Sequence, residues 1–386
     1  MKKVYKPYAG CALAGVLALL AACGGGGGGS TAGGGTGGGG GGSGGGGGNP
    51  PPSTDLVTSV PDPTYDSENL AVFRQLNLDR AGCGFGMVKQ DTRLDAAAAG
   101  HANYIKQNLS YTSGHTQTPG NPGYTGTTPW DRISATGYAY YWASEGIAFS
   151  GWGEPQGSNP GNPFTNITPS PKQGLRVLYA SVYHLRTLMS GYRDIGFAYA
   201  DRINTSGAGW LGIRTLVMDY AIPSGSVFQE IPSTSLAAYP CGGTANVQPI
   251  FGGEEPDPFP NTPKGSSPWR GTSDPYGQPL YFKAATGATL TYTSSILTPA
   301  GGGVVNTTVL DASNDPQGKL GRNEFFIVPT ARLQDNTRYD VTVSGTNSLF
   351  AGGSGTVALG TGSCNYVTSG AFTCTYSFTT GTFYSD

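Results

Sequence analysis

A run of 25 residues at 24–48, of which 20 are glycine, restricts the fold of this chain more than any other feature. No side chain in the run is larger than threonine, so it has no apolar surface to bury and is predicted to be a flexible chain. The glycines follow no Gly-X-Y period, which excludes a collagen helix. We therefore expect the folded part of the chain to begin after this run.

The residues before the run have the pattern of an export signal. Three lysines precede an apolar stretch at 9–22, which has 14 residues and is shorter than the roughly 17–25 that a membrane-spanning helix needs. We predict a signal peptide at 1–22. The stretch ends in the letters LAAC, which resemble the lipobox of bacterial lipoproteins, where the cysteine carries a lipid. The alternative is a plain signal peptide followed by an incidental cysteine.

The lipobox resemblance implies that Cys23 is lipidated and that the membrane is a partner through this anchor. Residues 23–53 would then be a tether, with three prolines at 50–52 stiffening its end. The residue after the cysteine is Gly24, which is not an inner-membrane retention residue in the familiar bacterial sorting rule. The resemblance therefore implies the cell envelope, at the outer membrane and facing the periplasm or the cell surface.

Charge and cysteine usage narrow the class of protein further. A net charge of -2 without a basic run after the first residues argues against a nucleic-acid partner. Besides Cys11 and Cys23, four cysteines remain, and an even number in an exported chain predicts disulfides with three possible connectivities. Domain position favours Cys83–Cys241 and Cys364–Cys374. No CxxC pair is present, so a thiolate zinc site is not expected.

Residues 54–245 have the pattern of helices followed by strands. Helices are predicted from Asp66 to about Gly82, from Asp91 or Thr92 onward, and from Ser170 to about Met189, each with a capping residue at its start. Strands are predicted at 143–149, 195–200 and 210–220.

Three segments of this region carry an ordered set of motifs: LNLDRAGCG with RLDAAAAGHANYI, then SGHTQTPG with PWDRISATGYAYYWASEGIAF, then LYASVYHLRTLMSGYRDIGFAYA. In order and spacing they resemble the CAP superfamily, the SCP-like domains, in its bacterial branch. The matching positions are Asn77/Arg80, Ala96–Ala99, His115, Arg132, Gly137-Tyr138, Glu145-Gly146-Ile147, Ser181/His184 and Ile195-Gly196-Phe197. The resemblance implies an α+β fold with a three-layer α-β-α sandwich.

The resemblance also implies a cleft, formed here by His115, Glu145 and His184. Eukaryotic members have a second glutamate before the last histidine, but the corresponding stretch at 165–168 has no carboxylate. Because CAP clefts can bind zinc, the resemblance implies zinc or another divalent metal as a cofactor, and two imidazoles with a carboxylate suit such an ion. The alternative is a hydrogen-bonded His–Glu–His network in a polar groove that holds no metal.

Catalysis by this cleft has only weak support in the sequence. Glu145 would suit a general base if burial raised its pKa, and Ser181 lies one helical turn from His184. However, the chain has no G-x-S-x-G elbow, and no aspartate on the same helix orients His184. A structural role is therefore favoured for Ser181. His101 lies on the apolar stripe of its helix and is predicted to be a core residue with one hydrogen bond.

Five aromatic residues crowd the segment around the glutamate, and aromatic rings beside polar cleft residues suit glycan or lipid binding. The alternative is core packing with some exposed rings. These residues are Tyr138, Tyr140, Tyr141, Trp142 and Trp152.

The last part of the chain is predicted to be a separate all-β unit. Residues 246–279 are rich in proline and are predicted to be a semi-rigid linker. From 280 to 386, strands such as 339–344 and 372–378 alternate apolar and polar residues, as in a β-sandwich. This region resembles bacterial Ig-like domains.

These observations together favour a lipid-anchored, non-catalytic extracellular binding protein, whose ligand is a small molecule, lipid, glycan or protein. One alternative is a hydrolase of envelope peptides or glycans that depends on a metal or on Ser181 and Glu145. The other is a structural adhesin.

Overall fold

The computed structural model describes residues 55–108, 114–153, 168–204, 211–262, 275–350 and 354–383. The expected signal peptide, Cys23 and the whole of the expected tether lie outside these residues. Within the described part of the chain, no helix has the length and apolar content needed to cross a membrane.

The first half of the molecule is built on a four-stranded sheet in the order β1-β3-β4-β2. The strands are β1 (Lys89–Gln90), β2 (Tyr140–Gly153), β3 (Asp194–Asn204) and β4 (Leu211–Pro223). All neighbours run antiparallel except β1 and β3. The expected strands at 143–149, 195–200 and 210–220 fall on β2, β3 and β4, although β2 is considerably longer than predicted.

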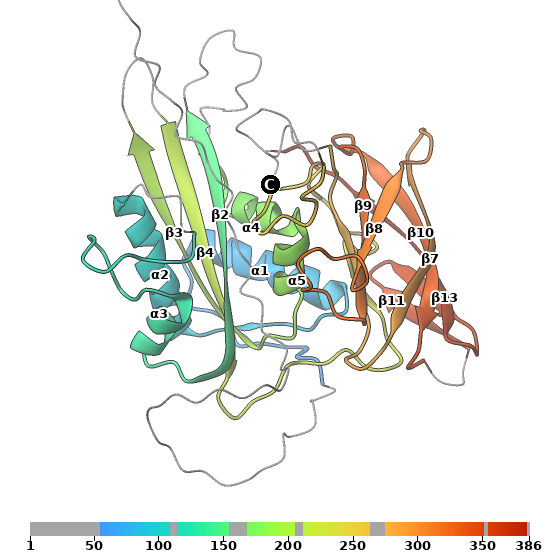
Figure 1. Cartoon of the computed structure of the whole chain (residues 1–386), viewed down its shortest axis with the longest axis horizontal. Helices are drawn as coiled ribbons and strands as arrows, with labels where there is room; N and C mark the ends of the chain where they lie inside the picture. Colours follow the sequence, from blue (N-terminus) through green and yellow to red (C-terminus); the bar gives the residue numbers. More distant parts are fainter. Residues whose placement is uncertain are drawn as a thin grey trace, which may run out of the picture.

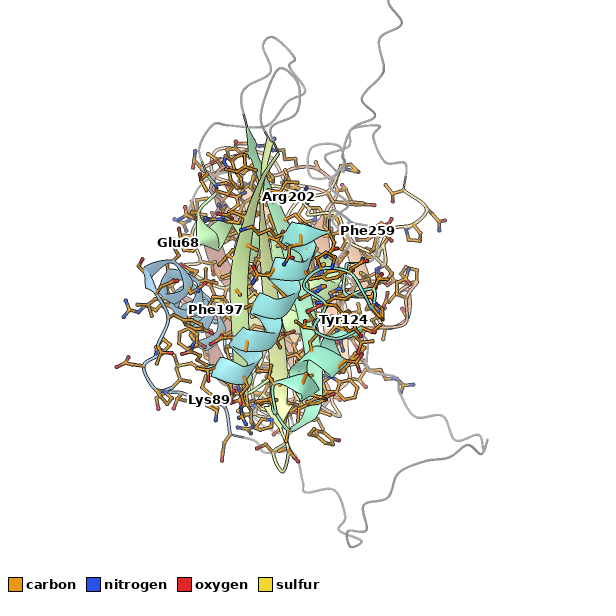
Figure 2. All side chains as sticks on the ribbon, turned by 90° about the vertical axis from the view of Figure 1, so that its left-hand side faces the viewer. Glu68, Lys89, Tyr124, Phe197, Arg202 and Phe259 are labelled. Atoms are coloured by element: carbon orange, nitrogen blue, oxygen red, sulfur yellow. A yellow bond between two sulfur atoms is a disulfide. The ribbon has the colours of Figure 1, made fainter. Side chains whose placement is uncertain are left out.

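Helices cover both faces of this sheet and give the expected three-layer α-β-α arrangement (Figure 1). One layer holds α2 (Thr92–Gln107) and α3 (Pro129–Ala135), and the other holds α1 (Ser67–Gly82), α4 (Pro171–Tyr179) and α5 (Val182–Leu188). Figure 2 looks onto the first layer, where α2 lies across the sheet beside the loop that carries Tyr124. The sheet has a hydrophobic core on each face, and alternating residues of β4 point into one or the other. Val217 packs under α2, and Leu216 belongs to the core on the opposite face.

All three predicted helices begin where their capping residues indicate, although the side chain of Ser170 makes no capping hydrogen bond at the start of α4. The side chain of Asp66 accepts a hydrogen bond from the backbone N–H of Asn69 at the start of α1, and Asp91 does the same for Arg93 at the start of α2. The single helix predicted from Ser170 to about Met189 is wrong. The structure has two helices here, because Ser181 is extended and the carbonyl of Ala180 accepts a hydrogen bond from the distant Gly252.

The asparagine and the arginine that lie three residues apart on α1 both bind backbone groups. The side chain of Asn77 makes two hydrogen bonds with the backbone of Val88. The buried guanidinium of Arg80 donates to the carbonyls of Phe85, Gly86 and Leu188, the last at the end of α5. These two side chains therefore fix the loop after α1 against the rest of its layer.

The second half of the chain forms two further sheets, as expected for a β-sandwich region that follows an α+β domain. One has the order β11-β12-β13-β10-β7 and the other β5-β6-β9-β8. Their strands are β5 (Ala237–Tyr239), β6 (Leu280–Lys283), β7 (Leu290–Pro299), β8 (Thr307–Asp311), β9 (Glu324–Pro329), β10 (Arg338–Asn347), β11 (Gly355–Leu359), β12 (Gly362–Tyr366) and β13 (Ala371–Thr379). The alternation predicted for β10 and β13 is confirmed by their burial patterns.

The two halves share structural elements across the expected linker. Strand β5, from the first half, pairs with β6 from the second. The start of the expected linker is also buried: Ile250, Phe251 and Glu254 are each at most 3% exposed. The segment 247–254 therefore packs as part of the fold.

The disulfides form in the two pairs that domain position favours. Cys83, just after α1, is bonded to Cys241, just after β5. Cys364 on β12 is bonded to Cys374, which lies opposite it on β13. Each bond therefore joins segments that the sheets and helices already bring together.

We expect Gly196 to be required for the close contact between β3 and α2. A Cβ atom at this position would lie 2.1 Å from the backbone nitrogen of Asp95 and 2.2 Å from the backbone carbon of Leu94. Since backbone cannot move aside cheaply, Gly196→Ala should lower the free energy of unfolding by about 2–3 kcal/mol, as measured by urea denaturation. Gly303→Ala is the matched control because no atom lies within 4 Å of its Cβ position. Equal stability of the two variants would contradict this account.

Candidate functional site

Glu145 lies on the edge strand β2 and faces the layer of α2 and α3. Its carboxylate is 2% exposed and accepts a hydrogen bond from Arg132 of α3 at 2.6 Å. The Nδ1 atom of His115 donates to the same carboxylate at 2.7 Å. Sequence analysis singled out all three residues, and the structure places them in direct contact.

The expectation of a raised pKa for Glu145 is wrong. Burial acts to raise the pKa of this carboxyl, but the positive charge of Arg132 and the neighbouring imidazoles outweigh burial and lower it to about 2. The carboxylate therefore stays ionised at neutral pH and is a weak base. Sequence analysis considered the burial of Glu145 but not the neighbouring guanidinium of Arg132, which opposes the effect of burial on the pKa.

Asp219 is a member of this cluster that sequence analysis missed. It lies opposite Glu145 in the pairing of β2 with β4, and it is fully buried. Burial, followed by the charge of Glu145, raises the pKa of Asp219 well above its usual range. A single acidic residue within the apolar letters LVMDYAI was the signal that could have identified it.

His101 is a buried core residue, as predicted, but it makes two hydrogen bonds where one was expected. Its Nε2 atom donates to the carbonyl of Gly114 at 2.8 Å, and its Nδ1 atom accepts from Gln117 at 3.1 Å. Burial lowers the pKa of His101 to about 4, so the ring is neutral at neutral pH. It lies 3.8 Å from Glu145 and supports the loop that carries His115.

His184 belongs to α5, in the layer on the opposite face of the sheet. Its Nδ1 atom lies 2.6 Å from the hydroxyl oxygen of Ser181 and 3.2 Å from a carboxylate oxygen of Glu254. Since the Ser181 hydroxyl donates to the carbonyl of Leu178, it is free to accept from Nδ1–H of His184. This network places the proton of His184 on Nδ1.

Glu254 is the second residue that sequence analysis missed, because it lies in the stretch predicted to be a linker. Its carboxylate is 1% exposed and accepts hydrogen bonds from the backbone N–H groups of Val182, Tyr183 and His184. A carboxylate is favoured there because the first N–H groups of a helix lack partners within it. Glu254 thereby gives His184 the carboxylate partner that residues 165–168 do not contain.

The geometry around Ser181 differs from that of a catalytic triad. In a triad the serine contacts Nε2 of the histidine and the acidic residue contacts Nδ1. Here Ser181 and Glu254 both approach Nδ1, and the Ser181 side chain is buried. Ser181 acts as the residue before the first turn of α5, which agrees with the structural role favoured from sequence.

The two site histidines share one arrangement although they lie on different layers. Each has a carboxylate at Nδ1, and the Nε2 atoms of His115 and His184 are both buried with no hydrogen-bond partner in the described part of the chain. An imidazole oriented in this way by a carboxylate is typical of metal ligands. Among the described residues, however, no three His, Cys, Asp or Glu side chains are grouped as a metal site, and a metal cofactor stays a prediction.

The aromatic residues near Glu145 mainly serve packing. Tyr138 and Trp152 are buried, and the hydroxyl of Tyr138 donates to Asp194. Trp142 packs against Phe228. Tyr141, at 58%, is the most exposed of the five rings named from sequence.

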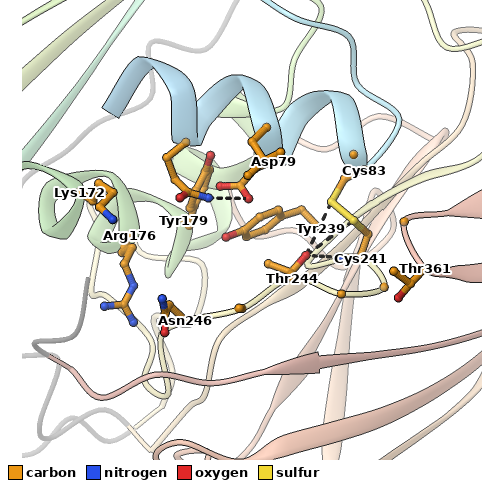
Figure 3. Close-up of a pocket in the computed structure, with 17 residues that line it drawn as sticks. Asp79, Cys83, Lys172, Arg176, Tyr179, Tyr239, Cys241, Thr244, Asn246 and Thr361 are labelled. Atoms are coloured by element: carbon orange, nitrogen blue, oxygen red, sulfur yellow. Dashed lines mark hydrogen bonds between the residues drawn. A yellow bond between two sulfur atoms is a disulfide. The ribbon is translucent and has the colours of Figure 1, made fainter. Parts of the chain in front are cut away.

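A cavity of about 440 Å³ lies away from these residues, between α1, α4 and the Cys83–Cys241 disulfide (Figure 3). Lys172 and Arg176 of α4 lie on one side of it, and Asp79 lies near the buried ring of Tyr179. Burial raises the pKa of Asp79 to about 6. None of His115, Glu145 and His184 lines this cavity, so it is not the predicted cleft.

A family model described as CAP, the cysteine-rich secretory protein family, matches residues 73–220. The match runs from α1 to β4 and includes His115, Glu145, Ser181 and His184. A search of the curated proteins found no match.

We expect Glu254→Gln to destabilise the protein, because an amide gives the N–H groups of α5 one oxygen where the carboxylate gives two. Hydrogen bonds to a charged group contribute more than neutral ones, so the free energy of unfolding should fall by about 2–3 kcal/mol in urea denaturation. Glu68→Gln is the control, since that side chain is 56% exposed. The role assigned to Glu254 would be contradicted if both variants kept the stability of the original chain.

Proposed function

We propose that this chain, in which residues 73–220 match the CAP family model, is a non-catalytic extracellular binding protein of the bacterial branch. In this proposal the chain is held at the outer membrane by a lipid on Cys23, facing the periplasm or the cell surface. Its ligand is a small molecule, lipid, glycan or protein. The observation that carries the proposal is the pair of histidines whose Nε2 atoms have no hydrogen-bond partner among the residues that the structure describes.

A binding role is favoured over catalysis by the state of the acidic and nucleophilic groups. Glu145 has a pKa of about 2, so it is too weak a base to take a proton efficiently at neutral pH. Ser181 is buried and shares the Nδ1 atom of His184 with Glu254. Neither residue is therefore prepared for hydrolysis.

The imidazole nitrogen atoms of the two histidines are ligands of a type that binds divalent cations. His115 and His184 lie in layers on opposite faces of the sheet, so each Nε2 atom is a separate candidate donor to such an ion, with Glu145 and Glu254 orienting the two rings through Nδ1. When bound, the ion would supply an electrophilic centre for an oxygen or nitrogen of the ligand. The protein's own part is to orient both rings through Nδ1, which leaves Nε2 as the donor atom.

We expect zinc to bind the purified chain and to bind at least tenfold more weakly after His115→Ala or His184→Ala, because each change removes one nitrogen donor. Isothermal titration calorimetry measures both affinities. Thr118→Ala, an exposed position in the same loop as His115, is the control and should leave the affinity unchanged.

Absence of zinc binding by the original chain, or equal affinity in both histidine variants, would contradict the metal proposal. The hydrolase alternative has a separate readout. Cleavage of a peptide or glycan library by the chain, lost in Glu145→Ala with folding retained, would replace the non-catalytic proposal.

The lipid anchor is tested by expressing the full chain in a Gram-negative bacterium. We expect it to enter the detergent phase of a phase-separation assay and to incorporate labelled fatty acid, because an acyl chain adds about 0.8 kcal/mol of membrane affinity per buried CH₂. Cys23→Ser should remain in the aqueous phase without label. A labelled Cys23→Ser protein, or an unlabelled original chain, would show that Cys23 is not the lipidation site.

A further inference from the structure

A second cavity, of about 390 Å³, opens where the CAP domain meets the β-rich half of the chain. On the CAP side it is lined by Trp142, Arg186 and Phe228, and on the other side by Lys283 and Glu324. Neither His115, Glu145 nor His184 lines it. The cavity is therefore separate from the candidate site described above.

Three of the charged groups in this cavity have partners within the protein. Arg186 donates to Glu324 at 2.7 Å, and Glu324 also accepts from Tyr281 and from the backbone of Gly321. Glu230 accepts from the backbone N–H of Thr286 at 2.6 Å. These groups have internal hydrogen bonds that compensate for their loss of water.

Lys283 is the exception. It lies on β6, opposite Ala237 of β5, and its ammonium group makes no hydrogen bond or ion pair with any residue that the structure describes. Burial lowers the pKa of Lys283, although the charges of Glu324 and Glu230 act in the opposite direction. Lys283 is half-buried in the wall of the cavity, so an anion that enters the cavity could form a charge-assisted hydrogen bond with its ammonium group.

The opposite wall of the cavity is aromatic. The rings of Trp142 and Phe228 lie 6.4 Å apart, and Phe228 also contacts Tyr192 at 5.9 Å between ring centroids. All three side chains line the cavity. Such walls bind flat or apolar groups, and a cationic group opposite them fixes the orientation of what they bind.

We propose that this cavity binds a small carboxylic acid with an aromatic body. The carboxylate pairs with the ammonium of Lys283, and the ring lies against Trp142 and Phe228. A single negative charge is favoured over a doubly charged phosphate because Glu230 and Glu324 already place carboxylates in the cavity. A volume of about 390 Å³ is at the lower end of the range for ligand pockets.

The probe is 2-naphthoate, titrated into the full chain by calorimetry. We expect one molecule to bind per chain, and 2-naphthalenemethanol, which has the same rings without the charge, to bind at least tenfold more weakly. Lys283→Gln should weaken naphthoate binding at least tenfold, and Lys283→Arg should largely retain it. Lys106→Gln, on the exposed face of α2, is the control.

The comparison of the two probes on the unaltered chain needs no variant, so it remains decisive if Lys283→Gln fails to fold. Equal affinity for naphthoate and naphthalenemethanol would overturn the proposal, as would no binding of naphthoate. Inorganic phosphate that competes with naphthoate at equal concentration would also overturn the preference for a single charge. Retained affinity in a folded Lys283→Gln variant would place the ligand elsewhere.

Discussion

The buried carboxylate of Glu254 connects the parts of this molecule that carry the candidate site. It accepts hydrogen bonds from three backbone N–H groups at the start of α5 and contacts the ring of His184. A buried carboxylate without such partners would be strongly destabilising, so α5 and the segment 247–254 must keep their relative position. The break between α4 and α5 belongs to the same arrangement, because Gly252 bonds the carbonyl of Ala180 at that break.

Local patterns were sufficient to predict much of the fold. Asp66 and Asp91 mark helix starts because capping is a contact between residues near in sequence. The alternating residues of β10 and β13 likewise indicate their buried faces. Contacts between residues about 70 positions apart determine both the break at Ser181 and the burial of 247–254. A local sequence pattern cannot predict such contacts. The proline content of that segment is equally compatible with an exposed linker.

Sequence motifs predicted only part of the candidate site. The sequence order indicated His115, Glu145 and His184, and the structure places the first two in contact. The charge state of Glu145 was not predictable, because it depends on the neighbouring side chains of His101, Arg132 and His115, which come from other parts of the chain. Glu254 was missed because the family pattern places a carboxylate before His184 in sequence, whereas this chain supplies one from about 70 residues after it.

The pairing of β5 with β6 has a consequence for how such a chain can change over time. If a recombination event joined residues up to 245 to a different partner, it would expose the edge of β5 and remove the carboxylate that caps α5. An exposed edge strand favours aggregation, and an uncapped buried helix start is unstable. The two halves of this protein are therefore expected to be inherited as one unit, even though each has the secondary structure of a separate domain.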